Sequence, residues 1–261
     1  MGLLLKAGIN LDLIKSAILA FGSIGFLILL INFTPILKER LPNYSLQLGG
    51  LIGNTSFLGI PIAIALLPTN TINFTIGFDL GTTLFAWIFG PFLLEDGINK
   101  NKFLNSKELL YALLNSPASK GVIGVFLLYL FRIENYIGDY LWIPARIVIV
   151  LAIIVVGTRL GIITNQKGEF FNIKKKVKNS ILLKLFIFPF FIFLVSLFLN
   201  FNFYQTSAIL LQSGTPSAIS TILMAEAYKT NQTLAASILF TTTLISIITI
   251  PLLTILINLA K

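Results

Sequence analysis

The fold is decided by the stretch Gly53-Asn54-Thr55-Ser56-Phe57-Leu58-Gly59-Ile60-Pro61 and by a second one, Gln212-Ser213-Gly214-Thr215-Pro216-Ser217-Ala218-Ile219-Ser220-Thr221. Both are polar and contain glycine in the middle of apolar segments. A proline inside a helix cannot donate a backbone hydrogen bond, and its ring crowds the carbonyl four residues earlier. Two helices are therefore predicted to open near the middle of a membrane. The residues expected at the breaks are Gly53, Gly59, Pro61 and Pro216.

The composition around these stretches is that of a membrane protein. Of the 261 residues, 56% are hydrophobic and only 11% are charged, with a mean hydropathy of +0.91. Soluble domains carry about 25% charged residues. Apolar runs near the length that crosses a bilayer recur along the whole chain. The sequence predicts an all-α, multi-pass protein of the cell (plasma or inner) membrane, with no removable signal peptide.

The residue inventory excludes most chemistry. The chain has no histidine and no cysteine, which removes imidazole bases, thiolates and most zinc or haem ligands. We therefore expect no enzyme activity, no metal and no cofactor. The net charge of +9 does not indicate nucleic acid, because its largest cluster, Lys174 to Lys178, abuts an apolar helix. Membrane topology explains that cluster better.

Eight transmembrane helices are predicted, near 16–36, 47–67, 73–94, 118–133, 142–163, 178–200, 205–227 and 234–258. A shorter amphipathic segment at 104–114 is expected to lie at the membrane interface. Most lysines and arginines fall in the loops after the first, third, fifth and seventh helices. The positive-inside rule then places these loops in the cytoplasm and both termini outside.

An internal repeat relates the two halves of the chain. A shift of 160 residues superposes Gly81-Thr82-Thr83-Leu84 on Thr241-Thr242-Thr243-Leu244 and Pro91 on Pro251. Because five spans separate the corresponding helices, the two units enter the membrane from opposite faces. The predicted organisation is a first repeat at 1–100, a cytoplasmic linker at 101–117 and a second, inverted repeat at 118–261. Inverted repeats with crossing broken helices are typical of secondary transporters.

The two opened helices are predicted to face each other and bind a substrate. Unpaired backbone groups are costly in hydrocarbon, so they should line a cavity or be buried in protein. The positive end of a half-helix suits an anion such as a carboxylate. The expected substrate-binding residues are Asn54, Thr55, Ser56, Ser213, Gly214 and Thr215. The alternative is that such residues only serve close packing and harmless kinks.

Charged residues inside the spans are candidates for ion coupling. Asp79 and Glu226 are the two acids considered, with Asp79 able to carry a coupled proton. For Asp79 a capping or interfacial role is favoured. Glu226 and Lys184 lie within about two turns of the predicted cytoplasmic ends, where long side chains reach the interface. Snorkelling is the favoured interpretation for both.

The chain resembles the auxin efflux carrier family of permeases. Gly53-Asn54-Thr55 with Leu58-Gly59-Ile60-Pro61 resembles the family's first crossover helix, and Pro216 followed by Ala225-Glu226-Ala227-Tyr228 resembles the second. The resemblance implies ten helices in two inverted sets of five, crossing at the substrate site, in a fold similar to bile-acid and sodium/proton transporters. On that map the predicted helices are three to ten, so the first helix and most of the second have no counterpart here.

The function predicted is that of a permease for a small organic anion, a carboxylate, working by alternating access. Its partners would be that anion, the lipid bilayer and a coupling proton or sodium ion, with no nucleic acid. The sequence is compatible with a homodimer and does not decide the oligomeric state. The alternative function is a truncated, non-transporting membrane scaffold or remnant of such a transporter.

Overall fold

The computed structural model describes residues 2–96, 111, 114, 117–166 and 175–259. Within these residues all regular elements are helices, and the extended pairing found is an isolated antiparallel bridge between Gly53 and Ser217. The all-helical class predicted from the sequence is confirmed. Most of the predicted linker at 101–117, including its interfacial segment, lies outside the described residues.

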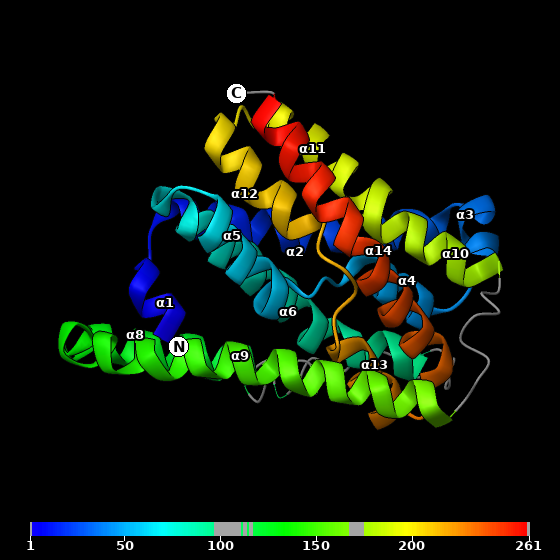
Figure 1. The fold of residues 1–261 in the computed structure, drawn as a ribbon, viewed down its shortest axis with the longest axis horizontal. Helices are drawn as coiled ribbons and strands as arrows, with labels where there is room; N and C mark the ends of the chain where they lie inside the picture. Colours follow the sequence, from blue (N-terminus) through cyan, green and yellow to red (C-terminus); the bar gives the residue numbers. More distant parts are fainter. Residues whose placement is uncertain (1, 97–110, 112–113, 115–116, 167–174, 260–261) are drawn as a thin grey trace.

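The helices in chain order are α1 (Gly2–Ala7), α2 (Leu11–Phe33), α3 (Pro35–Arg40), α4 (Tyr44–Leu51), η1 (Thr55–Gly59), α5 (Ile60–Leu66), η2 (Thr69–Thr71), α6 (Ile72–Asp96), α8 (Pro117–Leu130), α9 (Glu134–Gln166), α10 (Lys175–Leu182), η3 (Leu183–Ile187), α11 (Phe188–Phe198), α12 (Phe203–Ser213), α13 (Ser220–Ala227) and α14 (Gln232–Leu259). η1 and η3 are single π-helical turns, and η2 is a 3₁₀ turn. Figure 1 shows their arrangement.

Four helical segments in the described part are long and apolar enough to cross a membrane: Leu11–Phe33, Thr69–Leu94, Lys175–Phe198 and Gln232–Leu259. Half or less of each segment is buried inside the molecule. The rest of their apolar surface therefore faces outward, where only lipid covers it without a free-energy penalty. This confirms a membrane protein and leaves the number of spans to the proposal below.

Several helices begin earlier than the apolar runs indicated, α2 and α9 by the most. α2 starts at Leu11 rather than at residue 16, because Asn10 caps it: Asn10 Oδ1 accepts a hydrogen bond from the Leu13 N–H at 2.9 Å. α9 starts at Glu134 rather than at 142, and its first two turns carry the exposed Tyr136 and Tyr140. An apolar run marks the lipid-compatible part of a helix, whereas caps and polar turns extend the helix beyond it.

Helices α2 and α6 pack closely through glycines. A β-carbon on Gly77 or Gly81 of α6 would overlap the backbone carbonyls of Leu13 and Ala17 on α2, so only glycine permits this approach. Successive residues turn by about 100° around a helix. Asp79, halfway between the two glycines, therefore points away from α2 and toward the broken helix formed by α4, η1 and α5.

The first broken helix is held by elements from the second half of the chain. Its N-terminal part, α4, contacts α10 and α14 as well as α6 (Figure 1). Ser180 Oγ of α10 donates a 2.6 Å hydrogen bond to the Leu46 carbonyl of α4. Gly49 lies directly against Ile238 of α14. These contacts place the break in α4–η1–α5 beside the break between α12 and α13.

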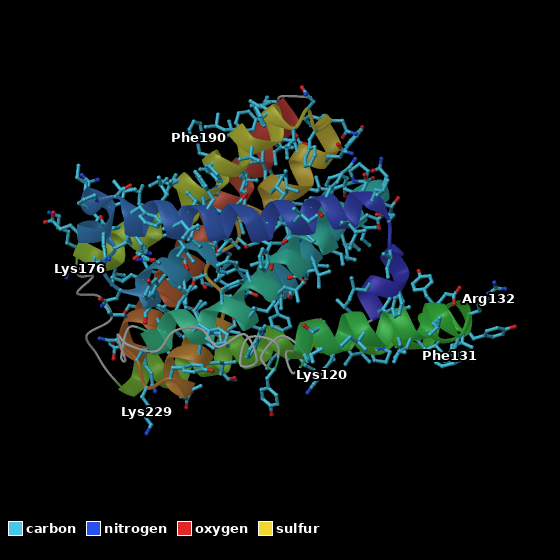
Figure 2. All side chains as sticks on the ribbon, turned by 180° about the vertical axis from the view of Figure 1, so that it is seen from behind. Lys120, Phe131, Arg132, Lys176, Phe190 and Lys229 are labelled. Atoms are coloured by element: carbon cyan, nitrogen blue, oxygen red, sulfur yellow. The ribbon has the colours of Figure 1, made fainter. Side chains whose placement is uncertain are left out.

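Helices α8 and α9 lie along one side of the molecule, with α1 packed on α9 (Figure 1). Phe131 and Arg132, in the turn between them, form the far end of this pair (Figure 2). Large apolar side chains on α9, including Ile147, Leu151 and Ile154, are exposed. This outward surface suits lipid and takes no part in the site described next.

Candidate functional site

The first break lies between Leu51 and Thr55. Helix α4 ends at Leu51, Ile52 and Asn54 leave the helical conformation, and η1 begins at Thr55. The N–H groups of Leu58 and Gly59 both donate to the Asn54 carbonyl, at 3.1 Å each, so the chain restarts as a wide π-helical turn.

Pro61 lies beyond this opening. It occupies the first turn of α5, where a missing N–H is tolerated, and the preceding π-turn accommodates its ring. The opening at 52–54 thus lies before Pro61 rather than at it, because the wide turn moves the disruption toward the N-terminus.

The second break spans Gly214 to Ile219. Helix α12 ends at Ser213, and α13 starts at Ser220. The Gly214 N–H still donates to the Leu210 carbonyl at 2.9 Å, whereas Pro216 has no N–H to continue the helix. Here the proline lies within the opened segment itself.

The two opened segments pair with each other as a short antiparallel bridge. The Asn54 N–H donates to the Pro216 carbonyl at 2.7 Å, and the Ala218 N–H donates to the Ile52 carbonyl at 3.0 Å. The Ser217 N–H donates to Thr242 Oγ1 of α14 at 3.1 Å. These three bonds give partners to backbone groups that neither helix satisfies internally, as a chain in hydrocarbon requires.

Lys184 lies buried against this crossing. Its side chain is 0% exposed, and Nζ donates a 2.8 Å hydrogen bond to the Ser213 carbonyl at the end of α12. Nζ also lies 4.9 Å from the centre of the Phe188 ring, on its face. A β-carbon on Gly53 would lie 3.0 Å from Nζ and 2.5 Å from Thr215 Oγ1. The absence of a side chain at Gly53 is what admits both groups.

The expectation that Lys184 snorkels to the interface is wrong. Its helix begins at Lys175, three residues before the predicted start at 178, which places Lys184 deeper in the span. In addition, Lys184 belongs to the π-helical turn η3, and its side chain is buried inside the molecule. Among the described residues no ion pair forms at Lys184.

Asp79 lies on the opposite side of the first break. Its Oδ1 accepts hydrogen bonds from Thr55 Oγ1 at 2.6 Å and from Ser56 Oγ at 2.5 Å. These hydroxyls belong to the first residues of η1, where a helix presents its positive end. The structure therefore places this carboxyl group beside the break, capping the second half of the broken helix rather than lying at a membrane interface.

The remaining expected site residues divide into two groups. Asn54, Thr55, Ser213 and Thr215 are all buried at the crossing, and Ser56 is half-buried there. Gly214 begins the second break, but a β-carbon there would face Leu253 of α14. Glu226 is exposed near the end of α13, and the structure does not bring it to the crossing.

The sequence does not identify two residues of the crossing as site residues. It predicts an interfacial position for Lys184 and assigns no role to Gln212, which belongs to the polar stretch at 212–221. Both are 0% exposed. The signal for Lys184 was a single cation within a long apolar run, and for Gln212 a long amide four residues before the proline of a broken helix.

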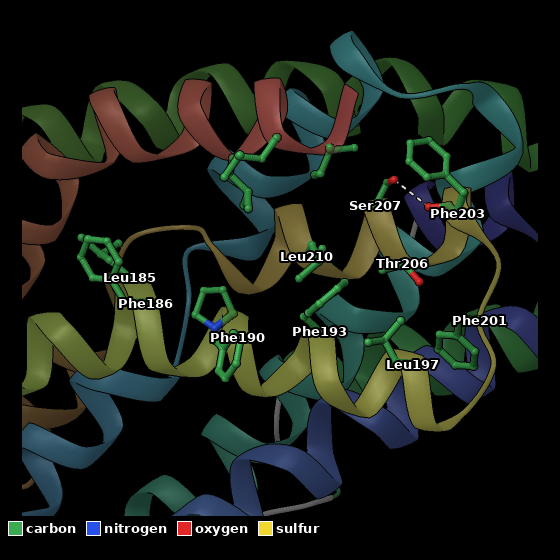
Figure 3. A pocket seen from close by; sticks show the side chains of 14 residues that line it. Leu185, Phe186, Phe190, Phe193, Leu197, Phe201, Phe203, Thr206, Ser207 and Leu210 are labelled. Atoms are coloured by element: carbon green, nitrogen blue, oxygen red, sulfur yellow. Dashed lines mark hydrogen bonds between the residues drawn. The ribbon is translucent and has the colours of Figure 1, made fainter. Parts of the chain in front are cut away.

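Two hollows elsewhere have the wrong chemistry for an anion. One of about 530 Å³ lies between α11, α12 and α14 and is lined mainly by aromatic and aliphatic side chains such as Phe190, Phe193 and Phe201 (Figure 3). Of its two hydroxyl-bearing residues, Thr206 and Ser207, the latter donates to the Phe203 carbonyl of its own helix. The other lies between α5 and α14 and is also apolar. The polar crossing remains the candidate site.

Comparison with known proteins agrees with this architecture. A family described as membrane transport protein matches residues 5–254. The chain belongs to the membrane transport protein family. The resemblance to auxin efflux carriers is thereby confirmed. A relative in the same family, an uncharacterized transporter of Methanocaldococcus jannaschii, is 26% identical over 211 residues, which cover 79% of this chain and 67% of that protein.

Membership of the membrane transport protein family identifies the chain as a membrane permease. Secondary transporters commonly bind their substrates at discontinuous helices, which makes the crossing of the two broken helices the candidate site.

Proposed function

We propose that this membrane transport protein carries a small organic anion, a carboxylate, by alternating access around the crossing of α4–η1–α5 with α12–α13. The observation that carries the proposal is the pairing of the two opened segments beside the buried Lys184. A buried ammonium group costs free energy, and residues that bear such a cost inside a membrane commonly mark a substrate or ion pathway.

The positive charge of the site supports an anionic cargo. Lys184 Nζ has a carbonyl and an aromatic ring as its neighbours, and neither neutralises its charge. A carboxylate is the group that would do so, through a charge-assisted hydrogen bond. The side chain of Asn54 lies at the same crossing and offers neutral N–H donors for the remaining oxygens.

Alternating access is supported by the correspondence between the halves. Thr82 of α6 and Thr242 of α14, which the 160-residue shift superposes, are both buried. Each bonds the carbonyl four residues earlier in its helix, Thr82 Oγ1 at 2.9 Å and Thr242 Oγ1 at 2.7 Å. Pro91 and Pro251 likewise lie inside α6 and α14. Two similar, oppositely inserted units would give the protein two related conformations.

The proposal includes eight spans in the cell membrane. Lys176 and Lys229, assigned to the cytoplasm, lie at one end of the molecule, and Arg132, assigned to the outside, lies at the other (Figure 2). For ion coupling, Asp79 is favoured over Glu226, because only Asp79 contacts the crossing.

The experiment is uptake of radiolabelled small carboxylates into proteoliposomes that contain the purified protein. The test variant is Asn54→Ala at the crossing, and the matched control is Asn43→Ala, an exposed residue before α4 whose side chain caps nothing. We expect uptake by the wild type and the control and a loss of at least about tenfold in Asn54→Ala, as when one buried contact is removed.

Two results would contradict the proposal. Wild-type vesicles that take up no carboxylate would favour the scaffold alternative. Wild-type rates in Asn54→Ala would show that the cargo does not pass through the crossing.

A further inference from the structure

Gln212 is a buried amide whose hydrogen bonds are not made. The residue is 0% exposed, and neither Oε1 nor Nε2 has a partner among the described residues. Its backbone carbonyl, in contrast, accepts a hydrogen bond from Thr215 Oγ1 at 2.7 Å. An amide side chain offers two donors and an acceptor, so both kinds of capacity are left unused.

The amide lies at the crossing. It comes from the last turn of α12 and lies against Gly59 of the other broken helix, where a β-carbon would overlap Oε1. Thr215 connects this point to the cation: its methyl group faces Gly59, and its hydroxyl faces Gly53, beside Lys184 Nζ. Gln212 and Lys184 therefore flank the same threonine, one on each side.

An unpaired amide in a dry interior costs free energy that an apolar side chain of the same shape would not. Packing alone therefore does not account for Gln212. A ligand that has both a hydrogen-bond donor and an acceptor would satisfy its amide group. A hydroxyl group has both. A carboxylate without a hydroxyl can only accept hydrogen bonds, so it would leave the amide oxygen Oε1 unpaired.

We propose that Gln212 is a specificity-determining residue that binds a hydroxyl group of the cargo, while Lys184 binds its carboxylate, so that the site selects hydroxycarboxylates. This inference rests on the proposed anion transport through the crossing. It assigns the cargo a class that the charge of the site alone does not.

The test is a comparison of matched substrates. Uptake of radiolabelled butanoate, 2-hydroxybutanoate and 3-hydroxybutanoate is measured in proteoliposomes of the wild-type protein. We expect at least one hydroxylated anion to have a value of kcat/KM about tenfold above that of butanoate. Tenfold corresponds to about 1.4 kcal/mol, the size of one net hydrogen bond.

The variant Gln212→Met keeps the length of the side chain and removes both polar atoms. We expect it to transport the three anions at similar rates and to unfold in detergent at a temperature no lower than the wild type. The matched control is Asn73→Leu, two turns before Asp79 on α6. It removes another buried amide oxygen, for which the described part of the chain provides no partner. That control should keep the preference for the hydroxylated anion.

The outcomes separate this inference from the function beneath it. Equal uptake of all three anions by the wild type overturns the role of Gln212 and leaves anion transport standing. A preference that survives Gln212→Met also overturns it. Uptake of none of the three overturns the proposed carboxylate transport and this inference together.

Discussion

The sharpest test of the site is the substitution Lys184→Met. Methionine has nearly the length of lysine and is apolar, so it fills the same space beside Phe188 and opposite Gly53. The change removes the charge and the 2.8 Å hydrogen bond to the Ser213 carbonyl. It therefore separates what Lys184 does for the fold from what it does for a bound anion.

The substitution has two opposing effects on the free energy of unfolding and one effect on the affinity for a bound anion. A hydrogen bond to a charged group contributes about 1.5–3 kcal/mol, which the variant loses. Holding an ammonium group within a membrane span costs about 2.5–3.5 kcal/mol on insertion scales, which the variant recovers. The free energy of unfolding should thus change by no more than about 1–2 kcal/mol. A carboxylate bound to Lys184 would lose about 1.5–3 kcal/mol, a fall of roughly 10- to 150-fold in affinity.

The assay combines two measurements on one preparation. Thermal unfolding in detergent reports the fold, and uptake in proteoliposomes over a range of carboxylate concentrations reports the affinity. Lys178→Met is the matched control, because Lys178 lies exposed on α10 of the same span. We expect Lys184→Met to unfold like the control and to need much higher carboxylate concentrations. If uptake by Lys184→Met matches the control, Lys184 does not bind the cargo.

Two further predictions concern the same crossing. Gly53→Ala places a methyl group 2.5 Å from Thr215 Oγ1 and 3.0 Å from Lys184 Nζ, so it should lower stability by about 1–3 kcal/mol and reduce uptake. Gly22→Ala, whose β-carbon meets nothing within 4 Å, should leave both unchanged or raise stability, and equal behaviour of the two alanine variants would show that the crossing is not tightly packed. Asp79→Asn keeps an oxygen that can accept from the two hydroxyl groups, but its amide cannot carry a proton. The variant should abolish any pH dependence of uptake, measured from pH 5 to 8. An unchanged pH profile would show that Asp79 does not take part in ion coupling.

The charged residues show why sequence reasoning placed some groups wrongly. The depth of Lys184 depends on where α10 begins and on how η3 winds, and neither follows from an apolar run. The direction of the Asp79 side chain depends on Gly77 and Gly81, which pack against α2 and so leave Asp79 on the other face of α6. Both are properties of helices in contact. Hydropathy therefore assigned Lys184 to an interface that it does not occupy, and for Asp79 it left open the choice between capping and an interfacial position, of which the structure shows the capping role.

The sequence alone determined the membrane class, the apolar helices and the polar, proline-containing stretches. Hydropathy and the missing N–H of proline are local properties of the chain. Only the tertiary structure decided that residues 52–54 pair with residues 216–218 and that Asp79, Lys184 and Gln212 gather around them. These residues come from segments far apart in the chain. They meet because backbone groups released by two breaks in a dry interior find their hydrogen-bond partners in each other.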